Sequence, residues 1–333
     1  MSERTNNILA PHPDWRYAFR RAWHGFMLHR GIDSAATLAF FAALTILPAA
    51  LSVVSAFAIA QGKDQAADTV LDLAQEILLP GTVDLVKEPL TQLFSIESPG
   101  AALIIGVLLS VWSMSSYATA FGRAANSVYE VQEGRRIVKF RGLMLVLSAF
   151  LLVAFAAVII LLLSTSNVAN AVAEALGVGE PWIALWVYGR WPVLGMILTM
   201  IIAVLYFYTP NIRHKRLRWV SSGALFAIIA WSLATTGFGI YVSTIANYDR
   251  VYGWLGGGLA VLIWLYISNL ALVAGLEVDA EFTRLRQLRA GVPAENTVQL
   301  PLRDTTRNLI LAKRQAADET DAISIRTRDS NSD

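Results

Sequence analysis

Residues 142–164 read GLMLVLSAFLLVAFAAVIILLLS, a run of 23 residues without a charged side chain. An α-helix needs about 20 apolar residues to cross the roughly 30 Å of hydrocarbon in a bilayer. A charge-free run of this length is therefore long enough to span a membrane. It predicts an all-α fold of the polytopic membrane class.

Five further stretches have the same character, so we predict a bundle of six transmembrane helices. All 27 Lys and Arg and all 25 Asp and Glu fall outside the six stretches, so each helix can enter lipid without burying a charge. The composition agrees, because 55% of the 333 residues are hydrophobic and 16% are charged. The predicted spans are residues 34–60, 99–121, 142–164, 191–208, 219–246 and 255–276.

The basic residues alternate along the chain, which predicts the sidedness of the spans. Lys and Arg near span ends are retained in the cytoplasm. The segments with five, five and four Lys or Arg are residues 1–33, 122–141 and 209–218; those with two, one and one are residues 61–98, 165–190 and 247–254. Six spans with both termini in the cytoplasm fit this alternation.

Three segments outside the spans complete the predicted organisation. In residues 1–33, apolar and aromatic residues recur at helical spacing between arginines, which fits an amphipathic helix in the membrane interface or packed on the protein's own cytoplasmic face. Residues 61–98, with seven acids and two lysines, predict an external helical hairpin. Residues 277–333 predict a cytoplasmic tail, disordered from about residue 318 because apolar periodicity is lacking there.

The sequence carries no motif of the common enzyme classes. It has no cysteine, which excludes disulfides, thiolate metal sites and thiol nucleophiles. A P-loop, a His-Glu-x-x-His pair and a Gly-x-Ser-x-Gly elbow are absent. We therefore expect no enzymatic activity, no cofactor and no metal, and the net charge of +2 gives no indication of nucleic acid as a partner.

Polar residues collect at the predicted cytoplasmic ends of spans one, two and six. They are Asp33, Arg123, Asn126 and Glu277. A paired network under the bundle, a vestibule for a polar head group and simple snorkelling anchors all fit this placement. Pro48, in the middle of the first span, is a candidate kink because it lacks the backbone N–H of a helical hydrogen bond.

The connection before the sixth span is dense in aromatic residues and glycines. Tyr252 suits the interfacial belt of a membrane protein, and Gly253 and Gly256 allow the chain to turn tightly back into the bilayer. These three residues are candidates for a structural turn.

Several short motifs follow one another in order along residues 15–285. They are Ala39-Phe40-Phe41 with Pro48, Trp112-Ser113, Ala125-Asn126 with Tyr129, Tyr252-Gly253-x-Leu255-Gly256, Trp264-Leu265-Tyr266-x-Ser268 and Gly275-Leu276-Glu277. In this order they resemble the YihY/BrkB family of bacterial inner-membrane proteins, once misnamed ribonuclease BN. The last motif departs by one residue from the family's usual Gly-Ala-Glu. The resemblance implies a bacterial plasma-membrane protein without established enzymatic activity. We take Tyr129, together with Asp33, Arg123, Asn126 and Glu277, as the candidate residues that contact a substrate or gate its passage.

Two functions follow as expectations. Uncharged spans disfavour an ion pump, which usually needs a buried ionisable site. Together with the basic N-terminal helix and the resemblance, they favour a facilitator, passive or driven by a partner, that moves or exports a lipid or other amphiphile in envelope maintenance. The alternative is a scaffold that does not transport and recruits envelope-assembly proteins. Membrane lipids and envelope proteins are the expected partners, and the sequence does not specify an oligomeric state.

Overall fold

The computed structural model describes residues 14–62, 67, 97–163, 180–213, 221–244 and 255–329. These residues form eight α-helices, and the only β contact among them is an isolated bridge between Ile212 and Leu302. The predicted all-α fold is therefore confirmed. The helices are α2 (Asp14–Leu28), α3 (Gly31–Gln61), α6 (Pro99–Val128), α7 (Ile137–Leu163), α9 (Glu180–Tyr208), α10 (Ser222–Thr244), α12 (Leu255–Arg289) and α13 (Thr306–Asp329).

Six of these helices are long and apolar enough to cross a membrane: α3, α6, α7, α9, α10 and α12. Each coincides with one predicted span, apart from shifts at the ends. The largest shift is in α12, which continues from the predicted end at residue 276 to Arg289. Its backbone stays helical past the apolar run because its charged side chains find partners on the protein itself, as described below.

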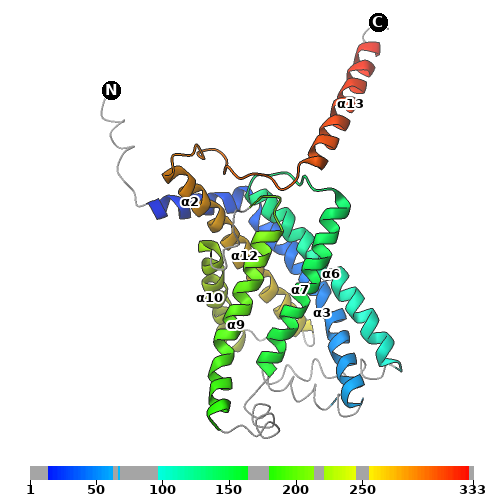
Figure 1. The fold of residues 1–333 in the computed structure, drawn as a ribbon, viewed down its shortest axis with the longest axis vertical. Coiled ribbons are helices and arrows are strands. Elements are labelled where there is room, and N and C mark those ends of the chain that lie inside the picture. The colour runs from blue at the N-terminus through cyan, green and yellow to red at the C-terminus, as the bar shows by residue number, and fades with distance from the viewer. Residues whose placement is uncertain are drawn as a thin grey trace.

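The spanning helices form a bundle in which α12 has a central place (Figure 1). It packs along α10 and α3 and also contacts α2, while α3 lies against α6, and α7 contacts both α6 and α9. The short helix α2 lies across one end of the bundle (Figure 1). We call this the basic end, because α2 and the connection between α6 and α7 both carry several arginines there.

Helices α10 and α12 approach at backbone distance through two glycines. A Cβ atom added at Gly223 would lie 2.2 Å from the carbonyl oxygen of Gly275. A Cβ atom added at Gly275 would lie 2.6 Å from Cβ of Ala227 and 2.7 Å from the hydroxyl of Tyr206. Small residues allow this kind of close crossing between helices in a membrane. The crossing holds α12 at a defined depth against α10 and α9.

Two tyrosine hydroxyls inside the bundle donate to a neighbouring helix. The Tyr117 hydroxyl donates to Oδ1 of Asn269 at 2.9 Å, and the Tyr206 hydroxyl donates to the carbonyl oxygen of Leu272 at 2.6 Å. Phe121 stacks between the two tyrosines, with ring centroids 6.5 and 6.0 Å apart. These contacts tie α6 and α9 to α12 and complete the core.

Helix α2 packs on the protein, one of the two arrangements predicted for the N-terminal segment. Ala18, Ala22 and Phe26 are buried. Trp15 and Trp23 stay mostly exposed, with 53% and 63% of their surface accessible. Helix α2 therefore packs one face on α12 and keeps aromatic side chains exposed beside that face.

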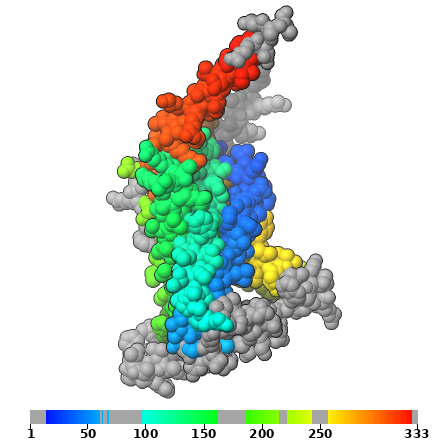
Figure 2. Space-filling model, turned by 90° about the vertical axis from the view of Figure 1, so that its right-hand side faces the viewer, coloured from blue at the N-terminus to red at the C-terminus, as the bar shows by residue number. Residues whose placement is uncertain are grey.

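The tail differs from its prediction, because residues predicted to be disordered from about 318 belong to helix α13. Asp304 starts this helix by accepting hydrogen bonds from the backbone N–H and the hydroxyl of Thr306, at 2.9 and 2.6 Å. Helix α13 then stands away from the bundle (Figures 1 and 2). A helix that buries no face needs no apolar periodicity, so the pattern that predicted disorder could not detect it.

Most of the external hairpin predicted for residues 61–98 lies outside the described residues. The same is true of Tyr252 and Gly253 in the predicted turn before the sixth span. Gly256, the third residue of that turn, is buried in the first turn of α12. The two predictions therefore stay predictions.

Candidate functional site

A partly buried ion pair links α2 to α12 at the basic end, next to a buried pair within α12. Nε of Arg21 lies 3.2 Å from Oε2 of Glu281, and Nε of Arg284 lies 3.1 Å from the same oxygen. The side chains of Arg284 and Glu281 are only 2% and 5% exposed. Arg284 also donates to the carbonyl oxygen of Ala294 at 2.9 Å. Both buried charges have partners, as burial away from water requires.

His29, in the turn between α2 and α3, lies between two carboxylates. Its Nδ1 is 2.8 Å from Oε1 of Glu277, and its Nε2 is 4.0 Å from Oε1 of Glu130. The hydrogen bond with Glu277 raises the pKa of His29 above 6.5; burial opposes this shift, and the negative charges of Glu277, Glu130 and Glu281 support it. The site therefore favours the protonated imidazolium, which donates to Glu277.

Arg284 joins these contacts into one chain, because its Nη2 lies 3.5 Å from Oε1 of Glu130. We call the whole set the α2 ion chain. With His29 protonated, its three carboxylates face three cations, so the charges of the set balance. The α2 ion chain consists of Arg21, Glu281, Arg284, Glu130, His29 and Glu277.

Asp279 makes a separate contact between three helices. Its Oδ2 accepts a hydrogen bond from the Tyr129 hydroxyl at 3.2 Å. Its Oδ1 accepts one from the backbone N–H of Gly223 at 3.4 Å. Gly223 lies in the first turn of α10, where free N–H groups favour a negative charge. Tyr129 thus connects the end of α6 to the crossing of α10 and α12.

Arg135 holds the connection between α6 and α7 against the end of α9. Its Nε lies 2.6 Å from Oε1 of Glu133, and its Nη2 donates to the carbonyl oxygen of Thr209 at 2.6 Å. Asn126 donates to Oε2 of Glu133 at 2.9 Å and accepts from the backbone N–H of Asn211 at 2.7 Å. Burial raises the pKa of Glu133, but the hydrogen bonds and charge of Arg135 and the hydrogen bond from Asn126 outweigh it and leave the pKa below 4.5.

The segment between α12 and α13 returns to this same point. The Asn211 amide donates to the carbonyl oxygens of Gln132 and Asp304, at 3.0 and 2.9 Å. Arg303 donates from Nε to the carbonyl oxygen of Ile212 at 2.7 Å and from Nη2 to that of Phe207. Hydrogen bonds from Thr306 lower the pKa of Asp304 to about 2. These contacts are structural, since they satisfy carbonyl groups at the end of α9.

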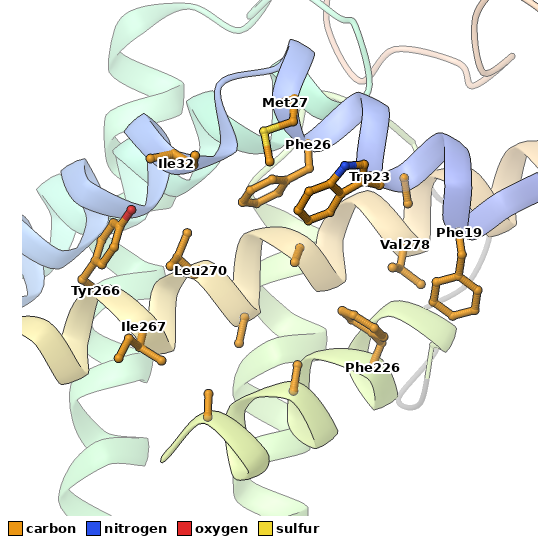
Figure 3. Close-up of a pocket in the computed structure, with 15 residues that line it drawn as sticks. Phe19, Trp23, Phe26, Met27, Ile32, Phe226, Tyr266, Ile267, Leu270 and Val278 are labelled. Carbon is orange, nitrogen blue, oxygen red and sulfur yellow. The ribbon is translucent and has the colours of Figure 1, made fainter. Parts of the chain in front are cut away.

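A groove of about 550 Å³ opens between α2, α10 and α12 (Figure 3). In Figure 3 Trp23 and Phe26 reach from α2 toward α12, while Phe19 of α2 lies near Phe226 of α10. The floor is formed by small and aliphatic residues of α10 and α12. We call it the α2 groove, and it is lined by Phe19, Ala22, Trp23, Phe26, Met27, Ile32, Phe226, Ala230, Ala234, Tyr266, Ile267, Leu270, Ala271, Ala274 and Val278.

The five predicted contact residues do not form one cluster. Glu277 belongs to the α2 ion chain, Asn126 to the contacts around Arg135, and Tyr129 to the contact with Asp279. All three are buried. Asp33 and Arg123 are exposed, and no ion pair joins either of them to another described residue. A paired network therefore exists under the bundle, but only part of the predicted set takes part in it.

Pro48 lies inside α3, which continues to Gln61. The hydroxyl of Ser52 donates to the carbonyl oxygen of Pro48 at 2.9 Å. Gly106 of α6 brings that helix close to this point, since a Cβ atom there would lie 3.0 Å from the Pro48 oxygen. Pro48 thus marks a close contact of α3 with α6, and the kink stays a prediction.

Sequence reasoning missed most of the α2 ion chain. The signal that could have found it is the spacing Glu277, Glu281, Arg284, which places three charged residues on one side of a helix directly after an apolar span. His29 and Arg21 could not be assigned to it, because no local pattern tells which distant helix they contact. Within the described part of the chain, no group of three or more His, Asp or Glu is arranged to hold a metal ion.

Comparison with known proteins places the chain in a family. The family model for virulence factor BrkB matches residues 22–298. The chain is 30% identical to the ribonuclease-like protein YfkH of Bacillus subtilis (strain 168) over 275 residues, which cover 81% of this chain and 95% of that protein. No solved structure matches the chain.

More distant relatives are named as membrane proteins. They include the UPF0761 membrane protein of Xanthomonas oryzae pv. oryzae (strain PXO99A) and the UPF0761 membrane protein XAC0937 of Xanthomonas axonopodis pv. citri (strain 306). Each is 23% identical over 276 residues, which cover 80% of this chain and 61% of the relative. These matches confirm the resemblance indicated by the short motifs. The chain is thus a multi-pass membrane protein that belongs to the BrkB virulence factor family.

Proposed function

We propose that this protein facilitates the transport or export of a lipid or other amphiphile across the bacterial inner membrane. The α2 groove carries the proposal. It is an apolar groove of about 550 Å³ at the end of a membrane bundle, within the size range of small-ligand sites. An amphiphile has an apolar chain to place in such a groove and a polar head for the charged surface beside it.

The proposed orientation has the basic end in the cytoplasm. Helix α2 and the connection between α6 and α7 both lie at that end and carry Lys or Arg. Arg213, after α9, donates from its backbone N–H to the carbonyl oxygen of Pro301, in the segment that leads to α13. Helix α13 starts from the same end, so both terminal helices lie on one side of the bundle (Figure 1). The retention of basic residues on the cytoplasmic side supports this orientation. In it, the α2 groove opens at the level of the inner leaflet.

The proposed role is facilitation without an enzymatic step. It requires that an amphiphile enter the α2 groove from one leaflet and leave it toward the other side of the membrane. This needs binding and a conformational change. The α2 ion chain has a defined part in this proposal. It holds α2 on α12 and thereby keeps one wall of the groove in place.

Lipid movement in reconstituted vesicles tests the proposal. Purified protein is placed in phosphatidylcholine and phosphatidylglycerol vesicles with a fluorescent phospholipid, and a membrane-impermeant reductant measures how fast label from the inner leaflet becomes accessible. We expect faster movement than in protein-free vesicles, and slower movement with Ala230→Phe, which fills the α2 groove. The matched control is Leu233→Phe, an exposed position of α10 that does not line the groove. Movement no faster than in protein-free vesicles would contradict the proposal.

Helix α13 supports the second candidate function, a scaffold that recruits envelope-assembly proteins. It stands away from the bundle (Figure 2). It exposes apolar residues along its length. They include Leu309, Leu311, Ile323 and Ile325. A photoreactive amino acid at position 323 would test this role in cells. Crosslinks to specific envelope proteins, together with no lipid movement in vesicles, would favour the scaffold over the facilitator.

A further inference from the structure

Helix α2 carries two kinds of arginine, which differ in their surroundings. Arg21 points toward α12 and pairs with Glu281 at 3.2 Å. Arg16 and Arg20 are exposed. They precede Trp23 and Met27 by seven residues each, so they lie on the side of the helix that lines the α2 groove. The exposed arginines therefore stand along the rim of the groove.

No described acid neutralises these two arginines. Residues 14–33 contain only two acids, Asp14 and Asp33. Asp14 pairs with Arg289 at 2.6 Å, and no ion pair joins Arg16 or Arg20 to any residue that the structure describes. The guanidinium carbon of Arg16 lies 5.4 Å from the centroid of the Trp15 ring. The rim thus presents two positive charges beside exposed aromatic rings.

The α2 groove itself is almost without polar groups. None of its 15 lining residues is charged, and only Trp23 and Tyr266 have a side-chain nitrogen or oxygen (Figure 3). Trp23 is 63% exposed, as expected for a ring at the boundary between water and hydrocarbon. A wholly polar ligand, such as free phosphate, would gain nothing from this lining. The material that surrounds the groove in a membrane protein is lipid, which has both an apolar chain and a polar head.

We propose that the α2 groove binds one anionic phospholipid, with an acyl chain in the groove and the phosphate at Arg16 and Arg20. The charges are complementary, because an anionic head group carries the opposite sign to the rim, and arginine is well suited to phosphate. This inference rests on the proposed function and names the class of amphiphile at that same site. Selection comes from the rim, since the apolar lining accepts the chain of any phospholipid.

Photocrosslinking tests the occupant directly. The full-length protein is reconstituted in phosphatidylcholine vesicles with a trace of phosphatidylglycerol that bears a diazirine on its acyl chain, and mass spectrometry locates the crosslinks. A parallel sample carries the same diazirine on phosphatidylcholine. We expect crosslinks on α2, α10 and α12 to be more abundant with phosphatidylglycerol. Replacing both rim arginines, R16Q and R20Q, should reduce the phosphatidylglycerol crosslinks by about fivefold for each arginine.

The matched control removes two positive charges that lie elsewhere on the protein. Lys313→Gln and Arg314→Gln change exposed residues of α13 and should leave the crosslinks unchanged. Ala230→Phe should reduce crosslinks from both lipids, because it blocks the chain rather than the head group. Equal crosslinking of the two lipids, or equal loss in the α13 control, would overturn the inference.

Lipid movement measured on the same samples separates this inference from the proposed function. Crosslinks at the groove without movement would uphold the anionic lipid site and reject facilitation. Movement that is insensitive to R16Q and R20Q, without preferred phosphatidylglycerol crosslinks at the groove, would reject the site and leave facilitation standing.

Discussion

Nδ1 of His29 lies 2.8 Å from Oε1 of Glu277, a carboxylate whose side chain is 1% exposed. The two residues are 248 positions apart in sequence. Their contact joins the turn after α2 to the part of α12 that follows the apolar span. Because α2 also forms one wall of the α2 groove, this pair connects the charged interior of the basic end to the proposed lipid site.

Removing the carboxylate should destabilise the protein strongly. In Glu277→Ala, the largely buried His29 loses its partner, and breaking a buried ion pair from one side costs about 3–5 kcal/mol. We expect a clearly lower midpoint of thermal unfolding in detergent. Asp33→Ala is the control, since Asp33 is an exposed acid near the same turn. Similar midpoints for the two variants would show that the pair contributes little.

The same pair should make stability depend on pH. The pKa of His29 is raised in the folded protein, by the hydrogen bond with Glu277 and by nearby carboxylates. A raised pKa stabilises the fold fully below the ordinary value of 6.5, and this contribution is lost as pH rises through the higher value in the folded protein.

Thermal unfolding of wild type and His29→Gln across a pH series checks this expectation. The groups that face His29 are Glu277 and Glu281 on α12 and Glu130 after α6, with Arg284 and Arg21 beside them. The difference in midpoint between the two proteins should be largest below pH 6.5 and shrink at higher pH. A difference that grows with pH would mean that His29 is neutral in the folded protein.

The crossing of α10 and α12 should not tolerate a methyl group. Gly275→Ala places a Cβ atom 2.6 Å from that of Ala227, so the helices must move apart, and overpacking of this kind costs about 1–3 kcal/mol. Gly237→Ala is the control on α10, where an added Cβ atom meets nothing within 4 Å. The midpoint of thermal unfolding should fall for Gly275→Ala and stay or rise for Gly237→Ala. Equal stability of the two variants would contradict the close contact of α10 and α12 at Gly275.

Two adjacent arginines should differ sharply in their effect on stability. Arg135 is buried and donates to Glu133 and to the carbonyl oxygen of Thr209, whereas Arg136 is exposed. Arg135→Gln removes donors from the partly buried Glu133 carboxylate and from a buried carbonyl group, which costs about 1–3 kcal/mol for each buried group left without a partner. Arg136→Gln should change little. Limited proteolysis near the connection between α6 and α7 measures the difference, and equal cleavage of both variants would contradict it.

The sequence predicted that the last span ends at residue 276, but the helix that carries it extends further. Residue 276 is the last apolar residue before Glu277, yet α12 continues to Arg289. Hydropathy indicates which part of a helix can lie in hydrocarbon, because moving a charged residue out of water costs free energy. It cannot show that the helix continues, since the continuation depends on Arg21 and His29 supplying partners from α2.

The candidate site was only partly predictable for the same reason. Glu277, Asn126 and Tyr129 all lie at the basic end of the bundle, and each is buried in a polar contact. Their placement in three different contacts, and the exposure of Asp33 and Arg123, depend on how the helices rotate about their axes. The α2 groove was not predicted at all, because its walls come from helices that are far apart in the chain.

The sequence by itself determined that six helices cross a membrane and which segments carry the basic charge. Lipid acts on each residue separately, so apolar length and charge count are sufficient to read these features. Only the tertiary structure decided which charges meet, that α2 lies on α12, and that a groove opens beside it. Those features depend on the crossing of distant helices, such as the glycine contact of α10 with α12, and no local pattern encodes such a crossing.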